Sequence, residues 1–273
     1  MIKITKKLIK IFLFNFLFKN KQIKNSFILF LPKFIAVKLE SAFKLWESLS
    51  IFRGKKLLQV NNEYWKIDPM PNKIQLEKYY QDNYWQNYRS NPGELIRSRD
   101  LEHFLLIVNH PEFSHGKKTF LNFGSGTGGG ISHLMYILGN NIINIEPGPM
   151  VNPYNLSPDY KHKKALRELP SDLKVDFFYA SHSLEHVAEL TEIEEFIKSK
   201  VKLGGYIFFE VPNALVELAG LLKNKVDGPH TYYFTRKYFE NLGLKVLFNS
   251  TYSNGIEMKS DEGEVIRFYA KVI

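Results

Sequence analysis

Cysteine is absent from this chain of 273 residues. Its absence excludes disulfide bonds, thiolate zinc sites and cysteine nucleophiles, and it is consistent with a cytosolic protein. Arginine is scarce too, with 7 residues against 30 lysines. Because bidentate contacts to bases and phosphates usually come from arginine, this shortage counts against a nucleic-acid partner. Internal repeats and low-complexity tracts are absent as well.

The formal net charge of +9 is concentrated in one part of the chain. Residues 1–60 contain 13 basic and 2 acidic residues, a net charge of +11, whereas the other 213 residues contain 24 basic and 26 acidic ones, a net charge of −2. The larger part therefore has no overall attraction for polyanions, and we expect no nucleic-acid substrate.

Residues 1–20 combine lysines with large apolar side chains. Lys3, Lys6, Lys7 and Lys10 have the spacing of one helical face, which predicts an amphipathic helix on an anionic membrane surface. The apolar stretch is far shorter than the ~20 residues of a spanning helix. Packing on the core or on a second subunit of a homodimer is an alternative. A secretory signal is disfavoured, because no small-residue cleavage site follows.

A glycine-rich stretch organises the rest of the chain. The apolar run 120–123 leads into Gly124, Gly126 and Gly129, and apolar residues then recur at helical spacing over 131–138. This pattern predicts a strand, a tight turn and a helix, as at nucleotide-binding sites. A second apolar run ends at Glu146, 22 residues after Gly124, where a carboxylate can bind ribose hydroxyls. Taken by themselves, these two features would also fit a nicotinamide dehydrogenase.

The following segments predict further strands. Residues 175–180 form an apolar run that leads into Ser181, and residues 201–205 predict a turn before a strand at 206–211. Two more β-prone runs, 244–248 and 265–272, are separated by the turn signals Asn254-Gly255 and Glu262-Gly263, which predicts a closing hairpin.

Five segments together resemble class I S-adenosylmethionine-dependent methyltransferases: FGSGTGGG, IEP, VDFFYASHSLEHV, LGGYIFFEVPN and HTYYFTRKYFENLGLKVL. Within that superfamily, EVPN and the H-x-Y-x-F-T segment are most similar to methyltransferases associated with cell-surface glycan biosynthesis. The resemblance implies an α/β, Rossmann-like fold with a seven-stranded, mostly parallel sheet, helices on both faces and an antiparallel last strand. We therefore divide the chain into a basic, helical N-terminal segment (1–60), a helical cap on the acceptor side (61–116) and an S-adenosylmethionine-binding catalytic domain (117–273).

The resemblance also implies which residues bind the cofactor. The predicted set is Phe123, Gly124, Ser125, Gly126, Gly128, Glu146, Pro147 and Ser181. Asn122 departs from the pattern, because the family usually has an acidic residue two positions before the first glycine.

The acceptor is expected beyond the fourth strand, where the predicted catalytic residues His182, Glu185 and His186 follow. His186 is the candidate general base and Glu185 its orienting partner, although the LEHV pattern also occurs where the histidine is only structural. We predict no metal ion, although His182, Glu185, His186 and His230 resemble a metal constellation of some O-methyltransferases. The predicted acceptor contacts are Tyr84, Trp85, Glu210, Asn213, His230 and Tyr232.

The sequence thus predicts an enzyme that uses S-adenosylmethionine to methylate a hydroxyl of a saccharide or glycan precursor. Its expected place is the cytoplasm, at the inner face of the membrane. A small-molecule or quinol-type hydroxyl, an RNA ribose hydroxyl and an inactive cofactor-binding scaffold are the alternatives.

Overall fold

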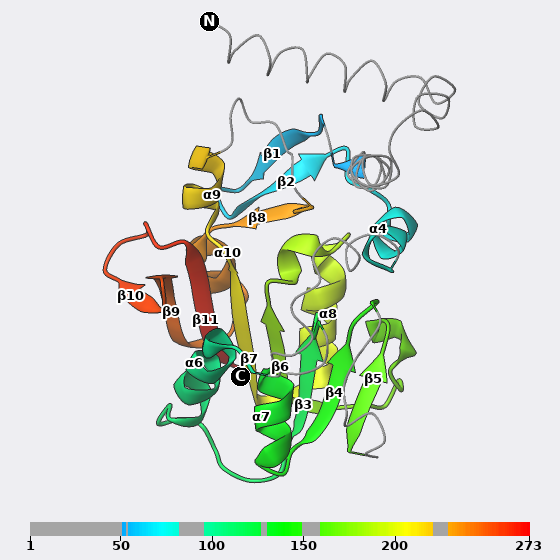
Figure 1. Cartoon of the computed structure of the whole chain (residues 1–273), viewed down its shortest axis with the longest axis vertical. Helices are drawn as coiled ribbons and strands as arrows, with labels where there is room; N and C mark the ends of the chain where they lie inside the picture. Colours follow the sequence, from blue (N-terminus) through cyan, green and yellow to red (C-terminus); the bar gives the residue numbers. More distant parts are fainter. Residues whose placement is uncertain (1–50, 53, 82–95, 127–129, 149–158, 221–228) are drawn as a thin grey trace, which may run out of the picture. The chain divides into compact units, whose positions relative to one another are not determined.

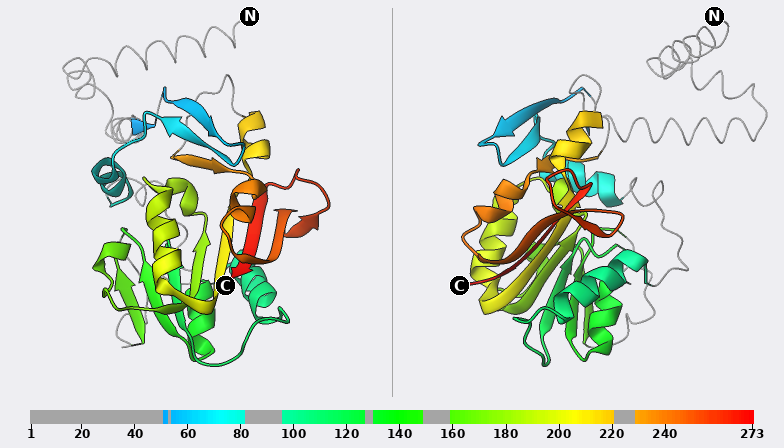
Figure 2. Two further views of the ribbon diagram at one scale, coloured as in Figure 1. Left: turned by 180° about the vertical axis from the view of Figure 1, so that it is seen from behind. Right: turned by 90° about the vertical axis from the view of Figure 1, so that its left-hand side faces the viewer.

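The computed structural model describes residues 51–273 except 53, 82–95, 127–129, 149–158 and 221–228. The predicted amphipathic helix at 1–20 therefore lies outside the described residues, as do Tyr84, Trp85 and Gly128. Figures 1 and 2 show the arrangement of the elements.

The main sheet contains eight strands among the described residues. Their order across the sheet is β10-β9-β11-β7-β6-β3-β4-β5 (Figure 1). The strands from β7 to β5 pair in parallel, and β11 pairs antiparallel with β7 and with β9. The bounds are β3 (Thr119–Phe123), β4 (Asn141–Ile145), β5 (Tyr160–Lys163), β6 (Val175–Ser181), β7 (Val201–Pro212), β9 (Lys245–Ser253), β10 (Ile256–Met258) and β11 (Val265–Lys271).

The sheet has one strand more than the seven predicted. Asn254 and Gly255 both have positive φ, 51° and 77°, and turn the chain into a hairpin in which β10 pairs with the end of β9. The Asn254-Gly255 turn thus connects β9 to the short strand β10. Strand β11 comes after β10 in the chain and pairs with β9 as well. The turn predicted at 201–205 is also wrong in part, because β7 begins at Val201 and continues through Gly204, which has φ of 75°.

Helices cover both faces of the sheet, and alternate strand residues divide between two cores. On one face Leu121 and Phe178 pack in a core with residues of α8 (Leu190–Lys200) and α10 (Arg236–Glu240). On the other face Phe120 and Phe177 pack with residues of α6 (Ser98–Val108) and α7 (Ile131–Ile137). Figure 2 shows α8 on the face opposite α6 and α7. This alternation is what a sheet buried on both sides requires.

A second, three-stranded antiparallel sheet joins distant parts of the chain. It consists of β1 (Lys56–Val60), β2 (Tyr64–Asp68) and β8 (Tyr232–Phe234), in that order. The helical character predicted for segments 1–60 and 61–116 is therefore wrong at β1 and at β2. Helix α4 (Lys73–Tyr79) follows, and its N-cap Asn72 exchanges hydrogen bonds with Gln75.

The second sheet lies beyond the carboxyl ends of β6 and β7 (Figure 1). There the Thr231 N–H donates to the carbonyl of Glu185, 2.7 Å away, in the 3-10 turn η4 (Leu184–His186). The main sheet changes direction of winding between β3 and β6, since β3 continues to β4 on one side while β6 continues to β7 on the other. Ligands of open α/β sheets bind at the carboxyl ends of the strands beside such a point.

Candidate active site

The turn after β3 brings the glycine-rich stretch against the segment after β6. Gly124 has φ of 72°, and its N–H donates to the Ile145 carbonyl at 2.8 Å. A Cβ at Gly124 would lie 2.3 Å from Cβ of Ser183. Only glycine suits this position, because both the backbone conformation and the close approach exclude a side chain.

Glu146 follows β4 and fixes the shape of the glycine turn. Its carboxylate accepts hydrogen bonds from the N–H of Gly126 and of Gly148, both at 2.9 Å, and the residue is buried. The carboxylate thus holds the turn after β3 and the turn after β4 together.

Asn122 stands where the resemblance predicts an acidic residue, and its side chain bonds to a residue of α7. Its amide donates to Ser132 Oγ at 2.8 Å, and this hydroxyl donates to Asn144 Oδ1 at 2.7 Å. All three residues are buried. Asn122 therefore links β3 to α7 and β4.

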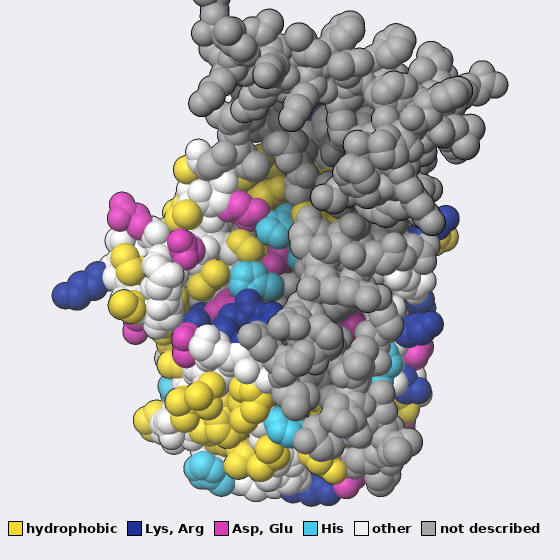
Figure 3. Space-filling view, viewed as in Figure 1, with side chains coloured by type: hydrophobic (Ala, Val, Ile, Leu, Met, Phe, Trp, Pro, Cys, Tyr) yellow, Lys and Arg dark blue, Asp and Glu magenta, His cyan; other side chains and the backbone are white. Residues whose placement is uncertain are grey.

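A cavity of about 570 Å³ lies at the carboxyl ends of β3, β4 and β6, within the usual size of ligand pockets. In the orientation of Figure 1, the space-filling view in Figure 3 shows histidine, basic and acidic side chains next to one another in the middle of the visible face. The predicted residues that line the cavity are Phe123, Gly124, Gly126, Glu146, Pro147, Ser181, His182 and His186. The predicted residues that are described but do not line it are Ser125, Glu185, Glu210, Asn213, His230 and Tyr232.

His182 adopts a left-handed backbone conformation, with φ of 49°. Its N–H donates to the carbonyl of Glu210, and its ring lies 3.3 Å from the carboxylates of both Glu185 and Glu210. Burial by itself would lower the pKa of His182, but the two carboxylates outweigh it and raise the pKa to about 9. His182 is therefore an imidazolium at neutral pH and cannot act there as a general base. Nor does it share a helical face with Glu185 and His186, because the helical turn begins only at Leu184.

His186 has the opposite electrostatic state. Burial lowers the pKa of His186 to about 4, so the ring is neutral. Nδ1 lies 3.2 Å from the Pro229 carbonyl, which makes Nδ1 the protonated nitrogen and leaves the lone pair on Nε2. His230 is next to it, with ring centroids 5.0 Å apart. Although burial by itself would raise the pKa of Glu185, contacts with His182 and His186 lower it to about 2.

Glu210 is the centre of a buried polar network that sequence reasoning did not find. It accepts hydrogen bonds from His103 Nε2 and Arg267 Nε, each at 2.7 Å, and His103 Nδ1 accepts one from the Tyr179 hydroxyl. Although burial would raise the pKa of Glu210, the hydrogen bonds from His103 and His182 hold it well below its usual range. One signal was present in the sequence: Arg267 is a single charge in the middle of an apolar strand.

Two predicted acceptor contacts have other partners. Asn213 donates from Nδ2 to the carbonyls of Asp261 and Gly263, so it fixes the loop before β11. Tyr232 is buried, and its hydroxyl donates to the Ala188 carbonyl at 3.2 Å.

Comparison with known proteins gives the family. A family model described as "Methyltransferase domain" matches residues 99–249, more than half of the chain. The chain belongs to this family. The methyltransferase takes its methyl group from S-adenosylmethionine. A search of curated proteins found no match to it.

Several solved structures are similar to this methyltransferase. An S-adenosylmethionine-dependent methyltransferase from Mesorhizobium loti is 12% identical, with a TM-score of 0.44 over 62% of this chain and 97% of that chain. One from Archaeoglobus fulgidus is 18% identical, with a TM-score of 0.44 over 69% of this chain and 97% of that one. Geranyl diphosphate C-methyltransferase from Streptomyces coelicolor A3(2) is 13% identical, with a TM-score of 0.45 over 64% of this chain and 76% of that chain.

The residues of the cavity fit the methyl donor. The glycine turn leaves room for close approach, and Glu146 lines the cavity at the end of β4, where a carboxylate can bind ribose hydroxyls. Ala165 and Leu166, at η3 (Leu166–Glu168), form an apolar part of the cavity wall together with Ile145.

Within the described part of the chain, no helix has the length and the apolar character to cross a bilayer.

Proposed function

We propose that this methyltransferase methylates a hydroxyl group of a saccharide or glycan precursor. The observation that carries the proposal is one cavity whose wall includes Gly126 and Glu146 on the donor side and His182 and His186 on the other side. Methyl transfer is an in-line displacement, so the donor and the acceptor must share one enclosed space.

His186 is the proposed group that removes the hydroxyl proton. Its Nε2 carries the lone pair, because Nδ1 donates to Pro229. The acceptor oxygen forms a bond to the methyl carbon, the carbon–sulfur bond breaks with its electron pair returning to sulfur, and the hydroxyl proton passes to Nε2. His182, held as a cation between two carboxylates, is proposed to orient Glu185 and to balance its charge.

The remaining wall of the cavity suits a hydroxyl-rich acceptor. Arg97, Arg99 and Glu189 line it, and Glu192 does so while paired with Lys73 at 2.6 Å. These side chains offer both donors and acceptors, which a sugar with several hydroxyls requires. The similarity of the EVPN and H-x-Y-x-F-T segments to glycan-associated methyltransferases supports the same acceptor class.

A membrane-linked precursor would also account for the N-terminal lysines. We propose that residues 1–20 hold the enzyme at the anionic cytoplasmic face of the membrane, near acceptors that are attached to lipid.

The test is a transfer assay with methyl-labelled S-adenosylmethionine and three acceptor pools: nucleotide- and lipid-linked saccharides, a short-chain quinol, and RNA. Label should enter the saccharide pool, and His186→Ala should lose this transfer while it still binds S-adenosylmethionine. Label in RNA or quinol alone would refute the acceptor class. Binding without transfer to any pool would favour an inactive scaffold.

A further inference from the structure

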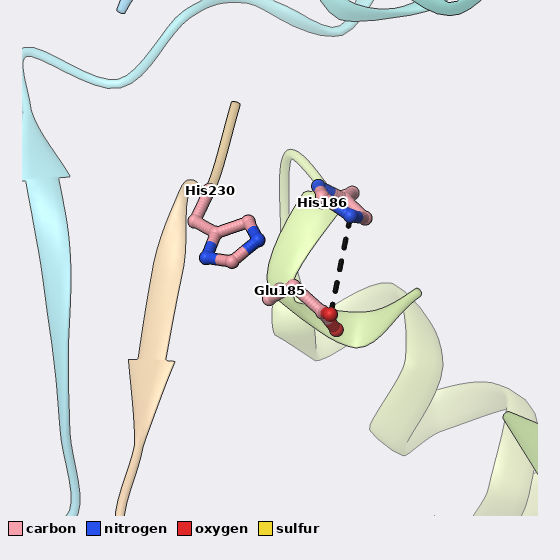
Figure 4. Close-up of side chains that lie close together, drawn as sticks. All are labelled: Glu185, His186 and His230. Carbon is pink, nitrogen blue, oxygen red and sulfur yellow. Dashed lines mark ion pairs between the residues drawn. The ribbon is translucent and has the colours of Figure 1, made fainter. Parts of the chain in front are cut away.

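Three side chains with metal-binding atoms meet beside the cavity. Glu185, His186 and His230, here called the Glu-His-His cluster, have ligand atoms that all lie within 4.8 Å of one another. Glu185 Oε1 and His186 Nε2 are 3.9 Å apart. Figure 4 shows one nitrogen of the His230 ring turned towards the other two side chains. We propose that this cluster binds one divalent transition-metal ion.

Hydrogen bonds determine which nitrogen of each histidine carries its proton. His230 Nδ1 lies 2.6 Å from Glu217 Oε1, and His186 Nδ1 lies 3.2 Å from the Pro229 carbonyl. Each Nδ1 therefore carries a proton, and the lone pair of each ring is on Nε2. Histidines that bind metals usually donate their other N–H to a carboxylate or a carbonyl in this way.

Glu185 supplies an independent indication of a cation. Its side chain is 1% exposed, and neither carboxylate oxygen accepts a well-aligned hydrogen bond from any described residue. His182 Nδ1, 3.3 Å from Oε1, is one nearby charge. A buried carboxylate that lacks hydrogen bonds is costly, and a coordinated cation would remove this cost.

The distances and the donor types define the class of ion. Nitrogen and oxygen ligands lie about 2.0–2.2 Å from zinc, so two ligand atoms of one ion are at most about 4.4 Å apart. The separation of 3.9 Å satisfies this limit, and the widest separation in the cluster needs only a small side-chain movement. Two imidazoles with one carboxylate favour zinc, iron, cobalt or manganese over magnesium. Three protein ligands leave coordination positions open, as in catalytic sites.

The role of the ion rests on the proposed function, whereas its binding does not. His186 belongs both to the cluster and to the cavity wall, so a bound ion would border the acceptor. An acceptor hydroxyl on the ion would lose its proton to water more readily, and its oxygen would then attack the methyl carbon as the carbon–sulfur bond breaks. His186 would in that case act as a ligand and not as the base, and the metal-free site predicted from the sequence would be wrong.

The experiment is a Co²⁺ titration of the untagged full chain after treatment with a chelator, followed by visible absorption and calorimetry. We expect one Co²⁺ per chain, displaced by Zn²⁺. Glu185→Gln and His230→Asn should weaken binding at least about 10-fold, and Glu217→Gln, which removes no ligand atom, by about 10-fold. The control variants His115→Asn and Glu257→Gln, both at exposed positions, should bind as the wild type does.

Binding of S-adenosylmethionine is measured on the same samples. Wild-type protein that binds S-adenosylmethionine but not one equivalent of Co²⁺ would overturn the metal site and leave the proposed function standing. Cobalt binding that is unchanged in Glu185→Gln and His230→Asn would overturn it as well. Retained S-adenosylmethionine binding shows that a variant is folded. If Glu185→Gln or His230→Asn loses it, Glu217→Gln decides: weaker cobalt binding supports the site, and unchanged binding refutes it.

Discussion

Arg267 and Glu210 face each other across β11 and β7, and Arg267 Nε donates a 2.7 Å hydrogen bond to Glu210 Oε2. The side chains are 4% and 1% exposed. Removing one partner of a buried pair leaves an uncompensated charge, which costs about 3–5 kcal/mol. Because His182 and His103 remain as partners of Glu210, we expect Arg267→Met to lower the free energy of unfolding by less than this, about 1.5–3 kcal/mol, the contribution of a hydrogen bond to a charged group, as measured by urea denaturation.

A surface pair of the same chemistry provides the control. Arg236 pairs with Asp261 at 2.8 Å, and these side chains are 36% and 57% exposed. Arg236→Met should cost less than about 1 kcal/mol, because solvent screens an exposed pair. Equal effects of the two substitutions would contradict the claim that the Arg267 pair matters through its burial.

The glycine turn can be tested by separating conformation from contact. Gly124 and Gly139 both have positive φ, but an added Cβ would meet Ser183 at Gly124 and nothing within 4 Å at Gly139. Gly139→Ala should destabilise by about 1–2 kcal/mol, the cost of left-handed backbone. Gly124→Ala should cost a further 1–3 kcal/mol or so from overpacking and should also weaken S-adenosylmethionine binding. The readouts are thermal unfolding and calorimetry, and a Gly124→Ala protein that matches Gly139→Ala in both would contradict the predicted contact with Ser183.

His103 should make stability depend on pH. It is fully buried, and burial lowers its pKa below the ordinary 6.5 although Glu210 opposes the shift. Below pH 6.5 the unfolded chain binds a proton that the folded chain does not, so this contribution to stability is present above pH 6.5 and is lost as the pH falls. Between pH 7 and pH 5.5 the free energy of unfolding should fall less for His103→Gln than for the wild type, with a difference of at most about 1 kcal/mol. Parallel pH profiles of the two proteins would show that His103 is not held neutral in the fold.

The order of the main elements could be predicted because its signals are local. The glycine turn after Phe123, the acidic residue after β4 and the apolar runs of β6 and β7 each lie within a few residues in the sequence. The short strand β10 was missed, because Asn254-Gly255 predicts a turn but does not say which strand the chain pairs with after it.

The parts that escaped prediction depend on long-range pairing. Strands β2 and β8 lie far apart in the sequence, and no periodicity shows that Tyr64 pairs with Phe234. His103 lies on a helix with ordinary amphipathic spacing, and it meets Glu210 only because α6 packs across β7. The predicted acceptor contact Asn213 follows β7, and Tyr232 begins β8. Hydrogen bonds to nearby carbonyls nevertheless determine where both side chains lie.

The lysines of residues 1–20 should give the protein affinity for anionic membranes. We expect the wild type to sediment with vesicles that contain phosphatidylserine and to stay in solution with neutral vesicles. Changing Lys3, Lys6, Lys7 and Lys10 to glutamine should abolish sedimentation, since each lysine near such a surface contributes about 1 kcal/mol. The control variant has the same number of lysine-to-glutamine changes elsewhere, at Lys198, Lys200, Lys202 and Lys245. If both variants lost sedimentation equally, the binding would depend on total charge and not on residues 1–20.

Glu146 should determine affinity for the cofactor. Its carboxylate accepts the N–H groups of Gly126 and Gly148 and lines the cavity, where a carboxylate can also bind the ribose hydroxyls. Hydrogen bonds to a charged group contribute about 1.5–3 kcal/mol, so Glu146→Gln should weaken S-adenosylmethionine binding by about 10- to 100-fold in calorimetry. Glu189→Gln is the matched control, because Glu189 also lines the cavity but lies on the side proposed for the acceptor. If the two variants bound equally, the ribose would lie elsewhere in the cavity, and the donor and acceptor sides assigned above would have to be exchanged.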